Sequence, residues 1–264
     1  MRNGMAEVNG ARLYYEIMGR GHPLVLIGGG GCMDRRMWND QVVPFAERYQ
    51  LVRYDPRGIG RSTMPSEPFS HDEDLYELLR FLEVDKAYLL GLSFGGGVAV
   101  DFGVEHPEMV DALIPAASGL SSLKDETMKG LSVLSELVKE KGVAQVVQMI
   151  LDSPAYPVPG NVSARFKIKE ILLENAHVFR SDFSFVRLMR PVHPPVDRRL
   201  SEIDAPSLIL VGERDYNEIH AIADQLESGI RGARKVVMTG AGHMLNLEKP
   251  EEFNRIVLEF LSKL

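Results

Sequence analysis

The chain has 264 residues, enough for one large α/β domain or two small ones. Its net charge of −7 and the lack of a basic run argue against a nucleic-acid partner. The sequence contains no run of about 18 apolar residues, the length that a membrane-spanning helix needs. A single cysteine, Cys32, excludes an internal disulfide, and the polar N-terminus lacks the apolar segment of a signal peptide. We therefore expect a cytoplasmic protein.

Strand and helix patterns alternate along the first part of the chain. Residues 7–18 alternate in polarity, as a hairpin or a pair of edge strands would. Four short apolar runs predict buried strands, at 24–27, 51–54, 87–90 and 110–114. Apolar residues at helical spacing predict helices over 37–48 and 71–82. Such alternation is typical of a parallel sheet covered by helices.

A G-x-S-x-G motif occupies residues 91–95, directly after one of these apolar runs and before a helical pattern that ends ahead of Pro107. In that context it predicts a nucleophile elbow, a strained turn that lifts Ser93 above the sheet. Glycine is needed at 91 and 95 because a Cβ at either position would strike the crossing backbone. A helix beginning at Phe94 would aim backbone N–H groups and its positive end at the same spot.

The alternation stops between about Ser121 and Leu200, where helical patterns follow one another without a strand. Apolar spacing indicates four helices there, near 131–138, 146–150, 168–172 and 185–189. Proline clusters bound these segments, at 154–159 and 191–195. The segment is either a separate helical unit or a set of further helices packed on the sheet.

Two more strands are predicted after this segment, and each leads into a loop that carries a candidate catalytic side chain. The run 207–211 ends in a loop that carries Asp215, and the run 235–238 ends in a glycine-rich loop that carries His243. Open α/β sheets place their sites beyond the carboxyl ends of the strands. Serine, aspartate and histidine follow in the chain order that a nucleophile-elbow hydrolase requires.

On these motifs the chain resembles the α/β-hydrolase family over nearly all of its length. The segment Tyr54–Ser62 is also similar to that family's loop after the fourth strand. The resemblance implies an α/β fold with a mostly parallel eight-stranded sheet, flanking helices and a helical cap inserted after strand 6. It also implies a Ser93-Asp215-His243 triad. We expect residues 1–120 and 201–264 to form the hydrolase core and residues 121–200 the cap.

The predicted oxyanion hole has one donor from the elbow and one from the glycine run 28–31. The first is the backbone N–H of Phe94, and alignment with the family's histidine-glycine-glycine pattern selects Gly30 as the second. Gly28 stands where the family has histidine, so the register of the second donor is open by one residue. We expect Gly31 and Trp38 to contact substrate, although core packing is an alternative for Trp38.

These residues predict a serine hydrolase that cleaves small carboxylic esters through an acyl-enzyme. Serine at the elbow separates the chain from dehalogenases and epoxide hydrolases of similar sequence, which have aspartate there. A lactonase or a carbon–carbon bond hydrolase with the same triad stays open, as does a small-molecule sensor that slowly hydrolyses its ligand. The partner we expect is a small-molecule ester; no cofactor or metal ion is expected, and the oligomeric state stays open.

Overall fold

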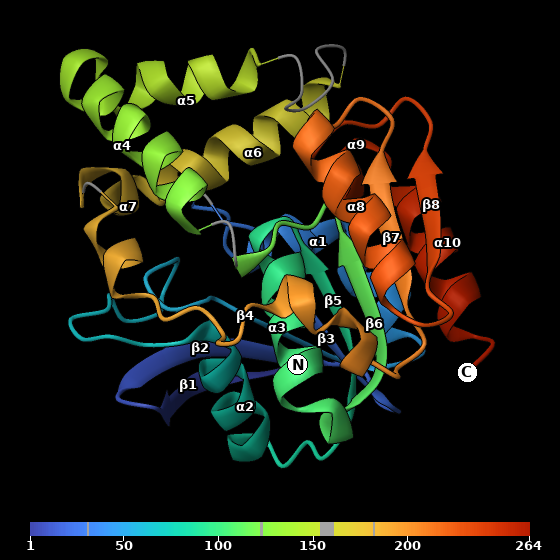
Figure 1. The fold of residues 1–264 in the computed structure, drawn as a ribbon. Coiled ribbons are helices and arrows are strands. Elements are labelled where there is room, and N and C mark those ends of the chain that lie inside the picture. The colour runs from blue at the N-terminus through green and yellow to red at the C-terminus, as the bar shows by residue number, and fades with distance from the viewer. Residues whose placement is uncertain (31, 122–123, 154–160, 182) are drawn as a thin grey trace.

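The computed structural model describes residues 1–30, 32–121, 124–153, 161–181 and 183–264. The described strands form one eight-stranded sheet in the order β1-β2-β4-β3-β5-β6-β7-β8. Only the pairs β1–β2 and β2–β4 are antiparallel within this sheet; the pairs from β4 to β8 are parallel. Together with the helices that flank the sheet (Figure 1), this order confirms the predicted fold class.

The strands are short, as the apolar runs predicted. Their bounds are β1 Arg2–Val8, β2 Ala11–Met18, β3 Pro23–Ile27, β4 Gln50–Tyr54, β5 Ala87–Leu92, β6 Val110–Ala116, β7 Leu208–Gly212 and β8 Arg234–Met238. The hairpin of β1 and β2 begins earlier than the polarity pattern indicated. Its first residues are largely exposed on both faces, so their sequence carries little alternation.

From β3 onward the described α-helices alternate with the strands, except that α4 to α7 follow β6 and both α9 and α10 follow β8. Their bounds are α1 Asn39–Ala46, α2 His71–Phe81, α3 Phe94–Glu105, α4 Lys124–Lys141, α5 Val143–Leu151, α6 Val162–Glu174, α7 Ala176–Arg180, α8 Asn217–Gly229, α9 Leu245–Glu248 and α10 Pro250–Leu261. Short 3-10 helices span η1 Arg35–Trp38, η2 Pro107–Met109, η4 Ser184–Leu188, η5 Val196–Arg198 and η6 Leu200–Glu202. The helix predicted over 37–48 is thus a 3-10 turn that runs into α1. None of the described helices is long and apolar enough to cross a membrane.

Strands β3 to β7 each supply two hydrophobic cores because their side chains alternate between the faces of the sheet. In β3, Leu24 and Leu26 belong to one core, whereas Val25 and Ile27 belong to the other. Phe45 of α1 packs in the first core, and helices α2, α3 and α8 contribute to the second. Burial on both faces explains why the parallel strands read as continuous apolar runs.

Helices α4 to α7 form a helical insertion between β6 and β7 (Figure 1). Figure 1 shows them gathered beyond the end of the sheet toward which the arrows of β7 and β8 point. Val146 of α5 and Ile168 of α6 are fully buried in the same core as Leu26 of β3. The fourth predicted helix is the 3-10 turn η4, and α7 lay outside the sequence prediction. The proline cluster at 154–159 lies outside the described residues. The division into core and cap stays a prediction.

The elbow helix α3 carries a buried acidic residue, Asp101. Its carboxylate accepts a hydrogen bond of 2.8 Å from the Ser121 hydroxyl, and the residue is 7% exposed. Burial raises the pKa of Asp101 to about 8; the Ser121 hydrogen bond opposes this rise, and the negative charges of Asp72 and Glu105 add to it. In the folded protein the carboxyl group is therefore neutral through most of the neutral range.

This neutral carboxyl group predicts a specific pH dependence of stability. An unfolded aspartate ionises near pH ~4, so between that pH and about 8 the folded state holds the extra proton. The contribution of Asp101 to the free energy of unfolding then falls as the pH rises through this window. Asp101→Asn stays neutral, so its stability relative to the wild type should increase from pH 5 to pH 9, measured by urea denaturation.

The exposed carboxylate of Glu73 on α2 provides a control for loss of a negative charge. Glu73→Gln should show no such gain on going from pH 5 to pH 9. A stability difference between Asp101→Asn and the wild type that is the same at both pH values would contradict a buried, protonated Asp101.

Candidate active site

Ser93 occupies a strained turn between β5 and α3. Its backbone has φ 56° and ψ −117°, in the left-handed half of conformational space that costs a side-chain-bearing residue energy. Tertiary hydrogen bonds fix this conformation: its N–H donates to the Ala116 carbonyl at 2.8 Å, and its carbonyl accepts from Gly97 and Gly119 at 3.2 and 3.0 Å. The conformation is therefore set by the fold around it.

The two glycines of the motif allow the backbone segments to cross. A Cβ on Gly91 would lie 2.0 Å from the Gly95 carbonyl oxygen, and a Cβ on Gly95 would lie 2.3 Å from the Ile27 carbonyl oxygen. Side-chain carbons do not approach other atoms so closely, so glycine is needed at both positions. This confirms the steric argument for glycine at both positions of the motif.

The structure brings Ser93, His243 and Asp215 together into one hydrogen-bonded chain. Nε2 of His243 lies 2.9 Å from Oγ of Ser93, and Nδ1 lies 2.8 Å from Oδ1 of Asp215. The three residues come from loops at the carboxyl ends of β5, β8 and β7. The side chains of Asp215 and His243 are 0% and 10% exposed. This geometry lets the imidazole take a proton from the hydroxyl while the carboxylate fixes its tautomer.

The carboxylate of Asp215 has few hydrogen-bond partners besides His243. Its Oδ1 atom also accepts the Tyr216 N–H at 2.8 Å, whereas Oδ2 is buried and has no hydrogen-bond partner among the described residues. An incompletely bonded buried carboxylate interacts strongly with a neighbouring positive charge, because the local dielectric constant is low. Asp215 is therefore well placed to stabilise a protonated His243.

Glu248 of α9 fixes the loop that carries His243. Its side chain is fully buried, and its two carboxylate oxygens accept the N–H groups on either side of the histidine: Gly242 at 2.9 Å and Met244 at 3.2 Å. Sequence reasoning missed this residue. Its one local signal is an acidic residue five positions after His243, which periodicity does not distinguish from an ordinary helical glutamate.

The residues of the two predicted oxyanion donors, Gly30 and Phe94, are in contact in the folded chain. Phe94 begins α3, and a Cβ on Gly30 would lie 2.8 Å from Cβ of Phe94, so a side chain at 30 would displace Phe94. The neighbouring Gly29 N–H donates to Sδ of the buried Met37 at 3.0 Å. This engagement of Gly29 favours Gly30 over Gly29 as the second donor. Gly31 lies outside the described residues.

Trp38, the other residue expected to contact substrate, lies in the hydrophobic core. Its side chain is fully buried, and its ring centroid is 6.1 Å from that of Phe253 on α10. Core packing is thus its observed environment, and a role in substrate binding stays a prediction. Among the described residues, no three or more His, Cys, Asp or Glu side chains are grouped so that they could hold a metal ion.

A strained serine between a strand and a helix, linked through histidine to aspartate at the carboxyl edge of a parallel sheet, defines the class of α/β proteins with a nucleophile elbow. The sequence profile of the Alpha/beta hydrolase family matches residues 24–256. The chain belongs to this family.

The matches to known proteins span nearly the full length of this chain. A curated relative from Serratia proteamaculans (strain 568), named "Putative carbamate hydrolase RutD", is 26% identical over 265 residues, which cover 95% of this chain and 96% of the relative. The structure titled "Est816 as an N-Acyl homoserine lactone degrading enzyme" is 28% identical with a TM-score of 0.72, covering 97% and 100% of the two chains. The enol-lactonase from Burkholderia xenovorans LB400 shares the fold, with a TM-score of 0.83 at 22% identity and coverage of 98% and 100%. The family and these relatives support hydrolase chemistry.

The contacts of Glu248 generate a prediction about the His243 loop. Glu248→Gln replaces one accepting oxygen with an NH2 group that faces a backbone N–H, so one buried donor loses its partner. We expect the free energy of unfolding to fall by about 1–3 kcal/mol, as measured by urea denaturation. The reaction of Ser93 with an organophosphonate, followed by intact mass, should also slow because His243 is held less firmly.

The control for this substitution lies four residues away on α10. Glu252 is partly exposed and pairs with Lys249 at 3.5 Å. Glu252→Gln should change the free energy of unfolding by less than about 0.5 kcal/mol. If Glu248→Gln and Glu252→Gln give the same free energy of unfolding and the same rate of reaction with the organophosphonate, Glu248 does not hold the loop.

Proposed function

We propose that this protein is a serine hydrolase that cleaves small carboxylic esters through an acyl-enzyme. The observation that carries the proposal is the hydrogen-bonded chain from Ser93 through His243 to Asp215, attached to a strained elbow serine. Serine at this position favours attack on an acyl carbon. The family membership and the relatives described above support the coarser class, a hydrolase.

In the first half of the reaction Ser93 attacks the ester. A serine hydroxyl is a poor nucleophile until a base removes its proton. His243 Nε2, 2.9 Å from Oγ, accepts that proton as Oγ bonds to the acyl carbon. Asp215, at Nδ1, keeps the imidazole in the required tautomer and stabilises the cation that forms.

The negative oxygen of the tetrahedral intermediate needs donors that are already in place. The N–H groups of Phe94 and Gly30 supply them in this proposal, with the positive end of α3 adding to the field. His243 then donates its proton to the departing alcohol, which leaves an acyl group on Ser93. Water enters, loses a proton to His243 and releases the carboxylic acid by the same steps.

A lactonase is the second candidate, favoured by the 28% identity to an N-acyl homoserine lactone degrading enzyme. A lactone is a cyclic ester, so the same three side chains would open it, and the alcohol would stay attached to the acyl group. The carbamate named for the Serratia relative also presents an acyl carbon with a heteroatom leaving group. The expected contacts of Gly31 and Trp38 with substrate, and the role of residues 121–200 as a cap, belong to this proposal.

Substitution of the triad tests the proposal. Ser93→Ala should abolish hydrolysis of p-nitrophenyl acetate and butyrate because no nucleophile is left. Asp215→Asn should lower kcat by about 10⁴-fold, since the imidazole is then held in the wrong tautomer. Ser207→Ala is the matched control: this serine is buried, and its hydroxyl donates to the Ala205 carbonyl away from the triad. It should leave kcat and KM unchanged.

A substrate panel separates the two candidates. kcat/KM is measured for the p-nitrophenyl esters and for N-acyl homoserine lactones of matching acyl length. Higher values for the esters, lost in Ser93→Ala, support the esterase; higher values for the lactones favour the lactonase. Hydrolysis that persists in Ser93→Ala would contradict both.

A further inference from the structure

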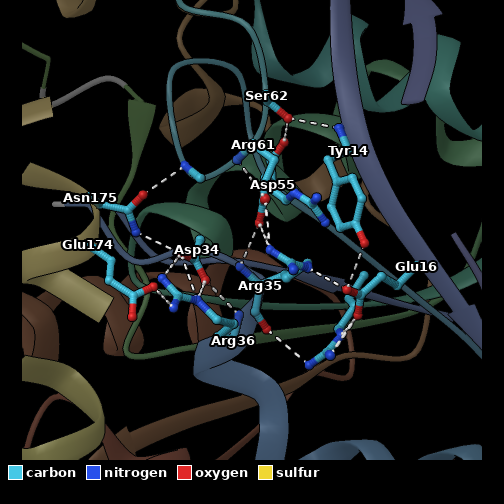
Figure 2. A network of polar contacts seen from close by, with 12 residues as sticks. Tyr14, Glu16, Asp34, Arg35, Arg36, Asp55, Arg61, Ser62, Glu174 and Asn175 are labelled. Atoms are coloured by element: carbon cyan, nitrogen blue, oxygen red, sulfur yellow. Dashed lines mark hydrogen bonds and ion pairs between the residues drawn. The ribbon is translucent and has the colours of Figure 1, made fainter. Parts of the chain in front are cut away.

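Asn175 is a buried asparagine at the junction of α6 and α7 that contacts two loops of the core. Its Nδ2 donates to the Cys32 carbonyl at 3.0 Å, to Oδ2 of Asp34 at 2.7 Å and to the Ile171 carbonyl at 3.1 Å. Its Oδ1 accepts the Gly60 N–H at 3.0 Å. Figure 2 shows the side chain between Asp34 and the loop after β4. The helical insertion is thus hydrogen-bonded to the loop that begins with Gly28.

The chemistry of these contacts requires an amide. The Cys32 carbonyl and the Asp34 carboxylate can only accept hydrogen bonds, whereas the Gly60 N–H can only donate one. A primary amide offers two N–H donors on one side and a carbonyl acceptor on the other, which is the set that these three partners need. With 2% exposure, Asn175 has little access to water that could replace these partners.

The donors of Asn175 contribute to a charged cluster around Asp34. The Asp34 carboxylate also accepts from the backbone N–H and the guanidinium of Arg36, and Arg36 in turn contacts Glu174 at the end of α6. Burial of Asp34 works against its ionisation, but the hydrogen bonds from Arg36 and Asn175 and the charge of Arg36 outweigh it and lower its pKa. The partner that Asn175 binds is therefore a firmly ionised carboxylate.

The loop after β4 is fixed by a second carboxylate. Asp55 accepts from the backbone N–H and guanidinium of Arg35 and from the Arg61 N–H, all at 3.0 Å (Figure 2). Gly60 turns tightly against it, because a Cβ there would lie 2.4 Å from Oδ2 of Asp55. The Arg35–Asp55 pair therefore connects the two core loops, and Asn175 connects both of them to the helical insertion.

The segment that carries Gly30 is consequently held on both sides. On its N-terminal side, the Gly29 N–H donates to Sδ of Met37, a residue of the core. On its C-terminal side, the Cys32 carbonyl accepts from Asn175, a residue of the helical insertion. Gly30 lies between these two fixed points and packs against Phe94.

We propose that Asn175 is a positioning residue for catalysis, which keeps Gly30 beside Phe94 in the arrangement that stabilises the oxyanion. This inference rests on the proposed function. Transition-state stabilisation then depends on the contact between the α6–α7 junction and the core, because loss of that contact frees one end of the loop. The ground-state complex depends on it much less, since the oxyanion forms only during the reaction.

The test compares two variants of Asn175 with a matched control. Asn175→Ala removes all its side-chain hydrogen bonds. Asn175→Asp keeps the shape and the acceptor for Gly60, but it removes the donors to Cys32 and Asp34 and places a second carboxyl group beside Asp34. The control is Lys167→Met on α6, the helix that ends next to Asn175; it removes an ion pair of 2.6 Å to Asp40 of α1. It weakens the contact of α6 with the core without touching the loop of Gly30.

Both Asn175 variants should lower kcat on p-nitrophenyl butyrate by about 10- to 100-fold, while KM stays within about twofold. Lys167→Met should stay within about twofold of the wild type in both. Hydrogen–deuterium exchange should rise in the peptide with the Gly29 and Gly30 amides in both Asn175 variants and stay at the wild-type level in Lys167→Met. A rise in exchange confined to this peptide separates positioning from a general loss of structure, and the split between kcat and KM assigns the effect to the transition state.

Equal kcat values for the Asn175 variants and Lys167→Met would overturn the inference while ester hydrolysis by Ser93 stands. So would unchanged exchange at Gly29 and Gly30, which is measured without any substrate. If Asn175→Ala does not fold, the isosteric Asn175→Asp carries the test alone. A wild-type protein without ester turnover would instead overturn the proposed function, and the catalytic role of Asn175 with it.

Discussion

The crossing of two backbone segments at Gly91 and Gly95 is the constraint on which the site depends. The turn after β5 has no room for a Cβ at either glycine, and this close approach holds Ser93 at a positive φ. The cost of that conformation is offset by the hydrogen bonds that Ser93 makes to Ala116, at the end of β6, and to Gly119, in the loop that follows. Ser93 therefore has its geometry before any substrate arrives.

The remaining parts of the site converge because parallel strands end at one edge of the sheet. Hydrogen bonds from outside the strands then fix two of the loops. Glu248 holds the loop of His243, and Met37 with Asn175 holds the loop of Gly30. Preorganised donors and acceptors of this kind cost no rearrangement during the reaction.

Helix α6 connects the two sides of this arrangement through the asparagines at its ends. Asn161, at its N-terminal end, donates to the Glu248 carbonyl at 2.8 Å, and Asn175, at its C-terminal end, donates to the Cys32 carbonyl. One helix of the insertion thus contacts both the element that fixes His243 and the loop that carries Gly30. The helical insertion is part of the support of the site.

The sequence predicts what local patterns encode. The helix expected over 71–82 is observed at His71–Phe81, and the short apolar runs are strands, because burial on one or both faces leaves a periodic signal. Helix α7, with five residues, is too short for such a signal. Asn175 and Glu248 could not be predicted, because their partners are set by tertiary packing and leave no local pattern; Asn175 bonds to a residue 143 positions away. Gly30 was chosen by alignment, and the engagement of Gly29 by Met37 adds a physical reason.

The account depends most on covalent chemistry at Ser93, and trapping the intermediate tests it directly. The protein is mixed with p-nitrophenyl acetate, quenched in acid within the first turnover and digested, and the peptides are weighed by mass spectrometry. We predict one acetyl group on the peptide that contains Ser93, formed at the rate of the p-nitrophenol burst and absent in Ser93→Ala. Turnover without an acetylated peptide, or an acetyl group on another residue formed at the burst rate, would contradict the account.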